Sequence, residues 1–214
     1  LEDPPIEEVV EGGIGDNLIA LLSASNDEIQ IEATWCLTNI ASGHTRHTES
    51  ILGAAPQLIN FLSAPNPRLQ EQALWTLGNI AGDSVSSREM LHANGALLPM
   101  ARLLQNPPTP SVARTAAWAL SNLARGQNTP AKPFLDLGLA TSLADAMRNE
   151  AKDRELAVEA GWVLAFLTAK DDESGSRLVQ AGIVSALVEA LVGSGGEDPL
   201  CTPVLRSLGN LVSG

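Results

Sequence analysis

The chain has 214 residues, of which 44% are hydrophobic, a net charge of −12 at pH 7 and two cysteines, Cys36 and Cys201. It can bury a sizeable core. Two cysteines in a chain of this length do not make a disulfide framework, so we expect a reducing compartment, and their spacing is not that of a metal-binding pair. The negative net charge disfavours nucleic acids and anionic membranes as partners, and it fits either basic partners or solubility alone. No apolar run reaches the length of a membrane span.

The predicted elements recur in the same order along the chain. A long helix carries ATWCLTNIASG, and then come a short helix (HTESIL), a turn at Gly53, an apolar helix (APQLINFL) and a polar loop (APNPR). The next two long helices carry EQALWTLGNIAG and AAWALSNLARG. Between them lie a short helix (SREML), an apolar helix (ALLPMARLL) and a polar loop (NPPTPS). Later in the chain, an apolar helix (IVSALVEAL) and a polar loop (GGEDP) repeat the pattern. Each long helix is predicted to close at a glycine: Gly43, Gly82 and Gly126. No strand pattern is present.

Four tryptophans mark the period of this pattern: Trp35, Trp75, Trp118 and Trp162, which lie 40, 43 and 44 residues apart. Tandem three-helix units of this length predict an all-α fold, a right-handed superhelical α-solenoid of about five armadillo-type repeats. We expect one solenoid over residues 1–214, with repeats at about 1–43, 44–83, 84–126, 127–169 and 170–214. The apolar end of the last helix leads us to expect that further repeats follow in a longer protein.

The helical phase separates the tryptophans from the buried stripe. At about 100° per residue, one stripe of the second long helix contains Ala73, Leu74, Leu77, Ile80 and Ala81. Trp75 points about 150° away from the centre of this stripe, and Trp118 has the same phase in its helix. The tryptophans are therefore predicted to face a ligand. Packing between repeats is the competing interpretation.

The strings TWCLTNIASG, LWTLGNIAGDS and AWALSNLARG resemble the importin-α armadillo repeats that bind basic nuclear localisation signals. The resemblance includes the family's irregularities, because Phe166 stands where an asparagine is expected and Arg206, followed by Asn210, where a tryptophan is expected. PPIEEVVEGG also resembles the family's lead-in to this region. Thr115 departs from the pattern at a position where the family often has asparagine.

The resemblance implies a function as a nuclear import adaptor that shuttles between cytoplasm and nucleus. Extended Lys/Arg-rich peptides would lie on a concave Trp/Asn-lined groove, and an importin-β-type carrier would bind through a segment that this chain lacks. Asp83 would pair with a critical lysine, and Gly43 and Thr48 would line the same pocket. The full predicted peptide-binding set is Trp35, Asn39, Gly43, Thr48, Glu71, Trp75, Asn79, Asp83, Trp118, Asn122, Glu159 and Trp162.

Several alternatives compete with this interpretation. An armadillo scaffold without transport activity is the main one, and Asp83, Glu32 and Glu159 also fit ordinary helix-end or solvated charges. Arg125 opposes a basic ligand, so we expect an intramolecular salt bridge for it. His44, His47 and Cys36 lack zinc spacing. We therefore expect no metal, no cofactor and no enzymatic activity, and no nucleic acid or membrane as partner.

Overall fold

The computed structural model describes residues 6–196 and 198–213. The first prolines of the predicted lead-in and Glu197 of the GGEDP loop lie outside these residues. Within them the secondary structure is helical and contains no strand, so the all-α prediction is confirmed. One bent pair of helices, α13 with α14, reaches the length and composition of a membrane span, but no single described helix does.

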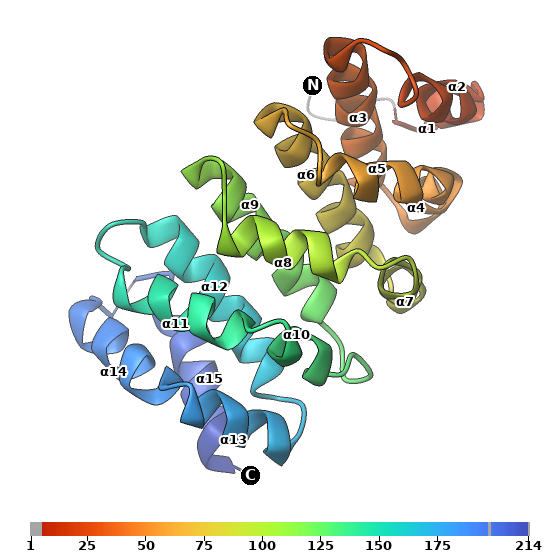
Figure 1. The fold of residues 1–214 in the computed structure, drawn as a ribbon. Helices are drawn as coiled ribbons and strands as arrows, with labels where there is room; N and C mark the ends of the chain where they lie inside the picture. Colours follow the sequence, from red (N-terminus) through yellow and green to blue (C-terminus); the bar gives the residue numbers. More distant parts are fainter. Residues whose placement is uncertain (1–5, 197, 214) are drawn as a thin grey trace. The chain divides into compact units, whose positions relative to one another are not determined.

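The helices follow one another in groups that each end on a long helix (Figure 1). The first two groups are α1 (Ile6–Glu11), α2 (Ile14–Leu21) and α3 (Asp27–Ala41), then α4 (Thr45–Ser50), the 3-10 turn η1 (Leu52–Ala54), α5 (Ala55–Phe61) and α6 (Pro67–Asp83). The third is α7 (Val85–Ala93), α8 (Leu97–Gln105) and α9 (Pro110–Ala124). The last two are α10 (Lys132–Asp136), α11 (Leu139–Arg148) and α12 (Arg154–Leu167), then α13 (Asp172–Gln180), α14 (Ile183–Gly193) and α15 (Cys201–Ser213).

The polar loops predicted between repeats start the long helices. Asn66 caps α6 by accepting the backbone N–H of Arg68 at 3.0 Å, and Thr109 caps α9 by accepting that of Val112 at 3.2 Å. In both cases a proline follows directly as the first helical residue, where its missing N–H costs nothing. The Asn-Pro and Thr-Pro pairs thus fix where each long helix begins.

The predicted closing glycines behave differently from one another. Gly126 has a φ of 93°, the left-handed conformation that favours glycine after a helix. Gly82 lies inside α6, which continues to Asp83, so the prediction that it closes the helix is wrong. The helix continues because Gly82 keeps a right-handed conformation, and Asp83 becomes its last residue.

The chain forms two compact units, residues 1–100 and 101–214. In the first unit α3 packs against α6, and in the second α12 packs against both α9 and α15 (Figure 1). The predicted apolar stripe of α6 is fully buried at all five positions. Each long helix is therefore held by its stripe, which leaves the tryptophan-bearing side for another role.

Candidate peptide-binding site

The first unit presents two tryptophans from equivalent positions of adjacent helices. Trp35 of α3 and Trp75 of α6 leave 51% and 48% of their surface exposed, whereas the flanking Leu74 and Thr76 are fully buried. The predicted separation of tryptophan from stripe is thereby confirmed for this unit. Two half-exposed indoles thus stand on neighbouring, packed helices, and we refer to the surface between Trp35 and Trp75 as the slot.

A buried polar network fixes the spacing of these two helices. The hydroxyls of Thr38 and Thr76 lie 2.7 Å apart, and Gln72 Nε2 donates to Thr38 Oγ1 at 2.7 Å. Asn79 Nδ2 adds a bond of 3.2 Å to the carbonyl of Thr38. The amide of Asn79 is held with its nitrogen toward α3, and its oxygen accepts no hydrogen bond within the described chain.

Asn39, one helix earlier, is exposed, and within residues 6–196 and 198–213 its side chain makes no hydrogen bond. An amide offers both a carbonyl acceptor and N–H donors, which are the groups that pair with a peptide backbone. Asn39 therefore presents both its amide donors and its acceptor without a partner among the described residues, and Asn79 presents its acceptor.

Asp83 ends α6 with a carboxylate oxygen that has no partner. Its Oδ2 atom is buried and accepts no hydrogen bond within the described residues. A buried unpaired acceptor is costly, and the C-terminal end of a helix carries partial negative charge. Arg88 already donates to the carbonyl of Ala81 at 2.7 Å, yet Asp83 Oδ2 stays without a donor. The position suits a cationic ligand group.

Gly43 and Thr48, which are predicted to line the pocket, are packed more tightly than the sequence suggests. Thr48 is fully buried, and its hydroxyl lies 3.4 Å from the carbonyl oxygen of Ala41. A Cβ atom at Gly43 would lie 2.4 Å from Nδ1 of His47. Gly43 is thus required for the buried His47 side chain, while its own backbone remains partly accessible.

His47 and Glu7 form a contact that sequence reasoning missed. His47 Nε2 lies 2.7 Å from Glu7 Oε2, and His47 Nδ1 accepts the backbone N–H of His44 at 3.2 Å. The hydrogen bond from His47 holds the pKa of the Glu7 carboxyl below its ordinary value. Glu7 is 40 residues from His47, so only a contact between α1 and α4 reveals the pair.

The second unit repeats the arrangement at positions 44 residues apart: Trp118 of α9, Trp162 of α12 and Arg206 of α15. Trp118 and Trp162 are half-buried, and Asn122 is buried. Asn210 Nδ2 donates to the carbonyl of Ala165 at 3.0 Å, the same kind of bond that Asn79 makes in the first unit. Equivalent asparagines thus tie successive long helices together in both units.

The charged candidates divide by their surroundings. Glu32 is exposed, and Glu71 and Glu159 are half-buried. Burial raises the pKa of the Glu159 carboxyl. The salt bridge expected for Arg125 is wrong, because no carboxylate among the described residues pairs with it and its Cζ atom lies 5.8 Å from the centre of the Phe166 ring instead.

The sequence matches the family model described as "Armadillo/beta-catenin-like repeat" over residues 3–42, 51–82 and 88–125. The chain belongs to the armadillo-repeat family. It is 40% identical over 216 residues to importin subunit alpha-9 of Arabidopsis thaliana, and 45% identical over 216 residues to importin subunit alpha-2 of Oryza sativa subsp. japonica. These matches cover 99% of the chain and 41% and 40% of the two relatives. The resemblance to importin-α repeats is therefore confirmed, for a region that spans about 40% of those relatives.

Solved armadillo structures give the same fold. A designed armadillo repeat protein in complex with the peptide (KR)4 has a TM-score of 0.88 and 26% identity, covering 96% of this chain and 85% of its own. An engineered protein with a TM-score of 0.89 and 30% identity covers 98% of this chain and 50% of its own. The predicted armadillo solenoid fold is confirmed, whereas the boundaries of the individual repeats stay a prediction.

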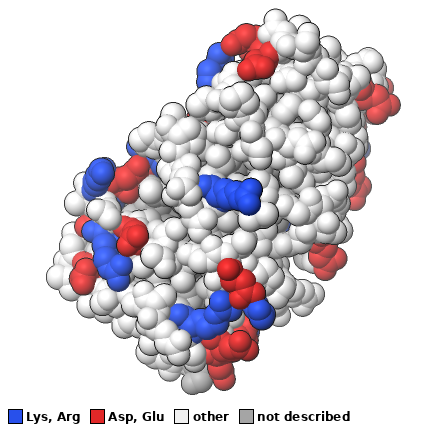
Figure 2. All heavy atoms as spheres, in the orientation of Figure 1, with Lys and Arg blue, Asp and Glu red and all other residues white. Residues whose placement is uncertain are grey.

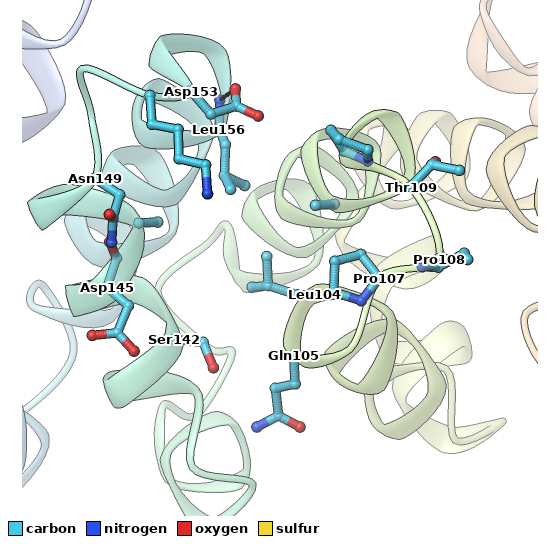
Figure 3. Close-up of a pocket in the computed structure, with 14 residues that line it drawn as sticks. Leu104, Gln105, Pro107, Pro108, Thr109, Ser142, Asp145, Asn149, Asp153 and Leu156 are labelled. Atoms are coloured by element: carbon cyan, nitrogen blue, oxygen red, sulfur yellow. Dashed lines mark hydrogen bonds between the residues drawn. The ribbon is translucent and has the colours of Figure 1, made fainter.

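One concave pocket of this armadillo chain lies away from every predicted site residue. It measures about 480 Å³ and opens between the α8–α9 loop, with Pro107 and Pro108, and the α11–α12 region, with Asp145 and Leu156 (Figure 3). Its carboxylates are already paired, Asp145 with Arg148 and Asp153 with Arg114.

The charges on the face seen in Figure 2 are scattered and of both signs, and most of that face is uncharged. Within the described residues, no three His, Cys, Asp or Glu side chains are placed to hold a metal ion. The features that point to a basic ligand are thus the half-exposed tryptophans, the asparagines beside them and Asp83.

Proposed function

We propose that this chain is the cargo-binding part of a nuclear import adaptor and that it binds Lys/Arg-rich nuclear localisation signals in extended conformation. The observation that carries the proposal is the pair of half-exposed indoles, Trp35 and Trp75, at equivalent positions of two packed helices. The similarity to importin-α subunits and to a designed armadillo protein in complex with (KR)4 supports it.

The slot suits a long basic side chain for a physical reason. Packed helices lie about 8–10 Å apart, which leaves room between two indoles for one extended side chain. Lysine and arginine bring apolar stems that pack on the rings and cationic heads that the rings attract, by about 0.5–2 kcal/mol per contact. A neutral aliphatic side chain would gain only the packing.

Asp83 would then select a cationic side chain, and the asparagines would hold the peptide backbone. The unpaired Oδ2 of Asp83 offers a site for an ammonium group, and a cation there would remove the cost of a buried unpaired acceptor. Asn39 and Asn79 would pair with the peptide backbone. Glu71 belongs to the proposed surface of the first unit, with Gly43 and Thr48 as supporting residues rather than direct ligands of the side chain. In the second unit, the corresponding proposed surface is formed by Trp118, Asn122, Glu159 and Trp162.

The proposal extends to transport. An importin-β-type carrier would bind the same protein, and the protein would shuttle between cytoplasm and nucleus. An armadillo scaffold that assembles proteins without transport is the alternative. The net charge of −12 suits basic partners in either case.

The test is binding of a fluorescent decapeptide with four consecutive Lys/Arg residues, measured by anisotropy at about 0.15 M salt. Trp75→Ala is expected to weaken binding about 3- to 30-fold, since it removes one wall of the slot. Asp83→Lys is expected to abolish the preference for lysine. Leu98→Ala, which removes a similarly exposed apolar side chain from α8, serves as the matched control and should have no effect.

Two results would contradict the proposal. One is a parent chain that binds the basic peptide no more tightly than an acidic peptide of the same length. The other is a set of protein partners whose binding is unaffected by Trp75→Ala, Asn79→Ala and Asp83→Lys, which would indicate the scaffold alternative.

A further inference from the structure

The concave pocket beside the α8–α9 loop stays open because a proline stands where the following repeat has an arginine. At that following junction, Arg154 of α12 pairs with Asp198 and donates to the hydroxyl of Ser194 at 2.8 Å. Arg154 thereby ties α12 to the residues that follow α14. Its counterpart 44 residues earlier is Pro110, whose ring carries no donor that could close the junction in the same way.

We name this hollow of about 480 Å³ the proline pocket, after Pro107, Pro108 and Pro110, which line it. Leu104 and Leu156 add apolar surface to its walls (Figure 3). Its volume lies within the range of sites that hold small ligands or anchoring side chains, about 300–1,000 Å³. The walls therefore favour an apolar group.

Lys152 brings a positive charge to the proline pocket. Its side chain is exposed, and within residues 6–196 and 198–213 its ammonium group makes no salt bridge or hydrogen bond. The carboxylates that line the pocket are engaged with other cations, Asp145 with Arg148 and Asp153 with Arg114. An ammonium group beside apolar walls therefore favours a ligand that joins an apolar group to an anionic one.

Two amide side chains present acceptors to the same pocket. Gln105 Nε2 donates to the carbonyl of Leu137 at 2.8 Å, and Asn149 Nδ2 donates to the carbonyl of Asp145 at 2.8 Å. The side-chain oxygens of Gln105 and Asn149 accept no hydrogen bond within the part of the chain that the structure describes. These oxygens can accept the N–H groups of a peptide, which a free carboxylic acid does not supply.

The charge of the second unit permits an acidic ligand. Residues 101–214 contain 12 acidic and 10 basic side chains, whereas residues 1–100 contain 13 acidic and three basic ones. Most of the net negative charge of the chain therefore belongs to the first unit. A nearly neutral unit repels an acidic segment little, whereas a strongly acidic one favours basic segments.

We propose that the proline pocket binds a short segment of a partner protein in which an apolar side chain adjoins an aspartate or glutamate. The apolar side chain would pack against Leu104 and Pro107, and the carboxylate would pair with Lys152. Peptide N–H groups would donate to the side-chain oxygens of Gln105 and Asn149. The pocket contains no residue of the proposed basic-peptide surface, so this would be a second, independent interaction site.

An NMR titration of the isotope-labelled chain with acetyl-Gly-Leu-Glu-Gly-amide tests the site. One apolar anchor and one exposed charge pair give an expected Kd on the order of 1 mM, so the peptide is added to about 5 mM. Two further peptides carry Gln in place of Glu, or Ala in place of Leu. The variant is Lys152→Gln, and the matched control is Lys132→Gln, which makes the same change on α10, outside the pocket.

The side-chain amide signals of Gln105 and Asn149 are expected to shift with the Leu-Glu peptide. Replacing Glu by Gln should weaken binding about two- to fivefold, as expected for one exposed charge pair, and replacing Leu by Ala about five- to twentyfold. In Lys152→Gln the preference for Glu over Gln should vanish, whereas in Lys132→Gln it should remain.

The inference is overturned if these signals do not move, if the Glu and Gln peptides bind equally well, or if the preference for Glu survives in Lys152→Gln. Isocaproate has the same isobutyl group and a carboxylate but no peptide N–H. If it bound as tightly as the peptide, the pocket would accept a free acid and the peptide proposal would be wrong. The fluorescent basic decapeptide should bind Lys152→Gln as tightly as the parent, so the outcome here is separate from that of the proposed function.

Discussion

The half-exposed tryptophan is the residue-scale feature on which the proposed function rests. Trp75 leaves 48% of its surface to solvent, although Leu74 and Thr76 on either side of it are fully buried. Successive residues of a helix point about 100° apart, so the stripe that anchors α6 necessarily turns Trp75 outward. An indole that the fold does not cover is available to a ligand.

Glu159 gives a residue-scale prediction about pH. Burial raises the pKa of its carboxyl in the folded chain, so the charged form is less favourable there than in the unfolded chain. Stability should therefore be lost as the pH rises through the folded-state pKa and be regained as the pH falls below it. Glu159→Gln is expected to raise the free energy of unfolding at pH 7, by about 0.5 kcal/mol, and to change little near pH 4.

Urea denaturation at the two pH values measures this difference. Glu189→Gln provides the control, because it is the same substitution at an exposed position of another helix, α14. An equal effect of Glu159→Gln at pH 4 and pH 7 would mean that burial does not disfavour its charged form.

The pairing of α3 with α6 sets the geometry at the element scale. Thr38, Thr76 and Gln72 are bonded to one another between the two helices, and Asn79 reaches from α6 to the carbonyl of Thr38. Polar bonds have preferred lengths and directions, whereas apolar contacts tolerate sliding. The network therefore fixes the register of the two helices and, with it, the position of Trp35 relative to Trp75.

A double-mutant cycle tests this register network. Thr38→Val removes the acceptor of Gln72 Nε2 and the partner of the Thr76 hydroxyl, so it is expected to cost about 1–2 kcal/mol of unfolding free energy. Thr38→Val with Thr76→Val should cost less than the sum of the two single changes, since both ends of one bond disappear together. Urea denaturation measures all three, and exposed Thr45→Val is the control. Strict additivity would show that the two hydroxyls are not coupled.

The net negative charge of the whole molecule is expected to change the association rate constant for a basic ligand more than the dissociation rate constant. A net charge of −12 attracts basic ligands over a distance that salt shortens, because the Debye length is about 10 Å at 0.1 M and about 3 Å at 1 M. The slot contacts act at short range and are screened less.

Stopped-flow measurements with the fluorescent basic decapeptide test this division at the scale of the molecule. Between about 0.05 and 0.5 M salt, the association rate constant is expected to fall about tenfold or more, while the dissociation rate constant changes less than about threefold. If salt changed mainly the dissociation rate constant, the dominant charge interactions would be contacts within the complex, which would contradict this prediction. An uncharged peptide of equal length should show neither change.

The sequence by itself determined the elements, the repeat and the phase of the tryptophans. Periodic apolar residues and the Asn-Pro and Thr-Pro starts are local signals, and the buried stripe around Leu77 follows from helical geometry alone. Only the tertiary structure decided how residues about 40 positions apart meet: His47 with Glu7, Asn79 with Thr38, and Arg206 with Trp162. Arg125 shows why. A charge at the end of a helix predicts a salt bridge or a ligand, and only the packing of α9 against α12 places this side chain on the Phe166 ring.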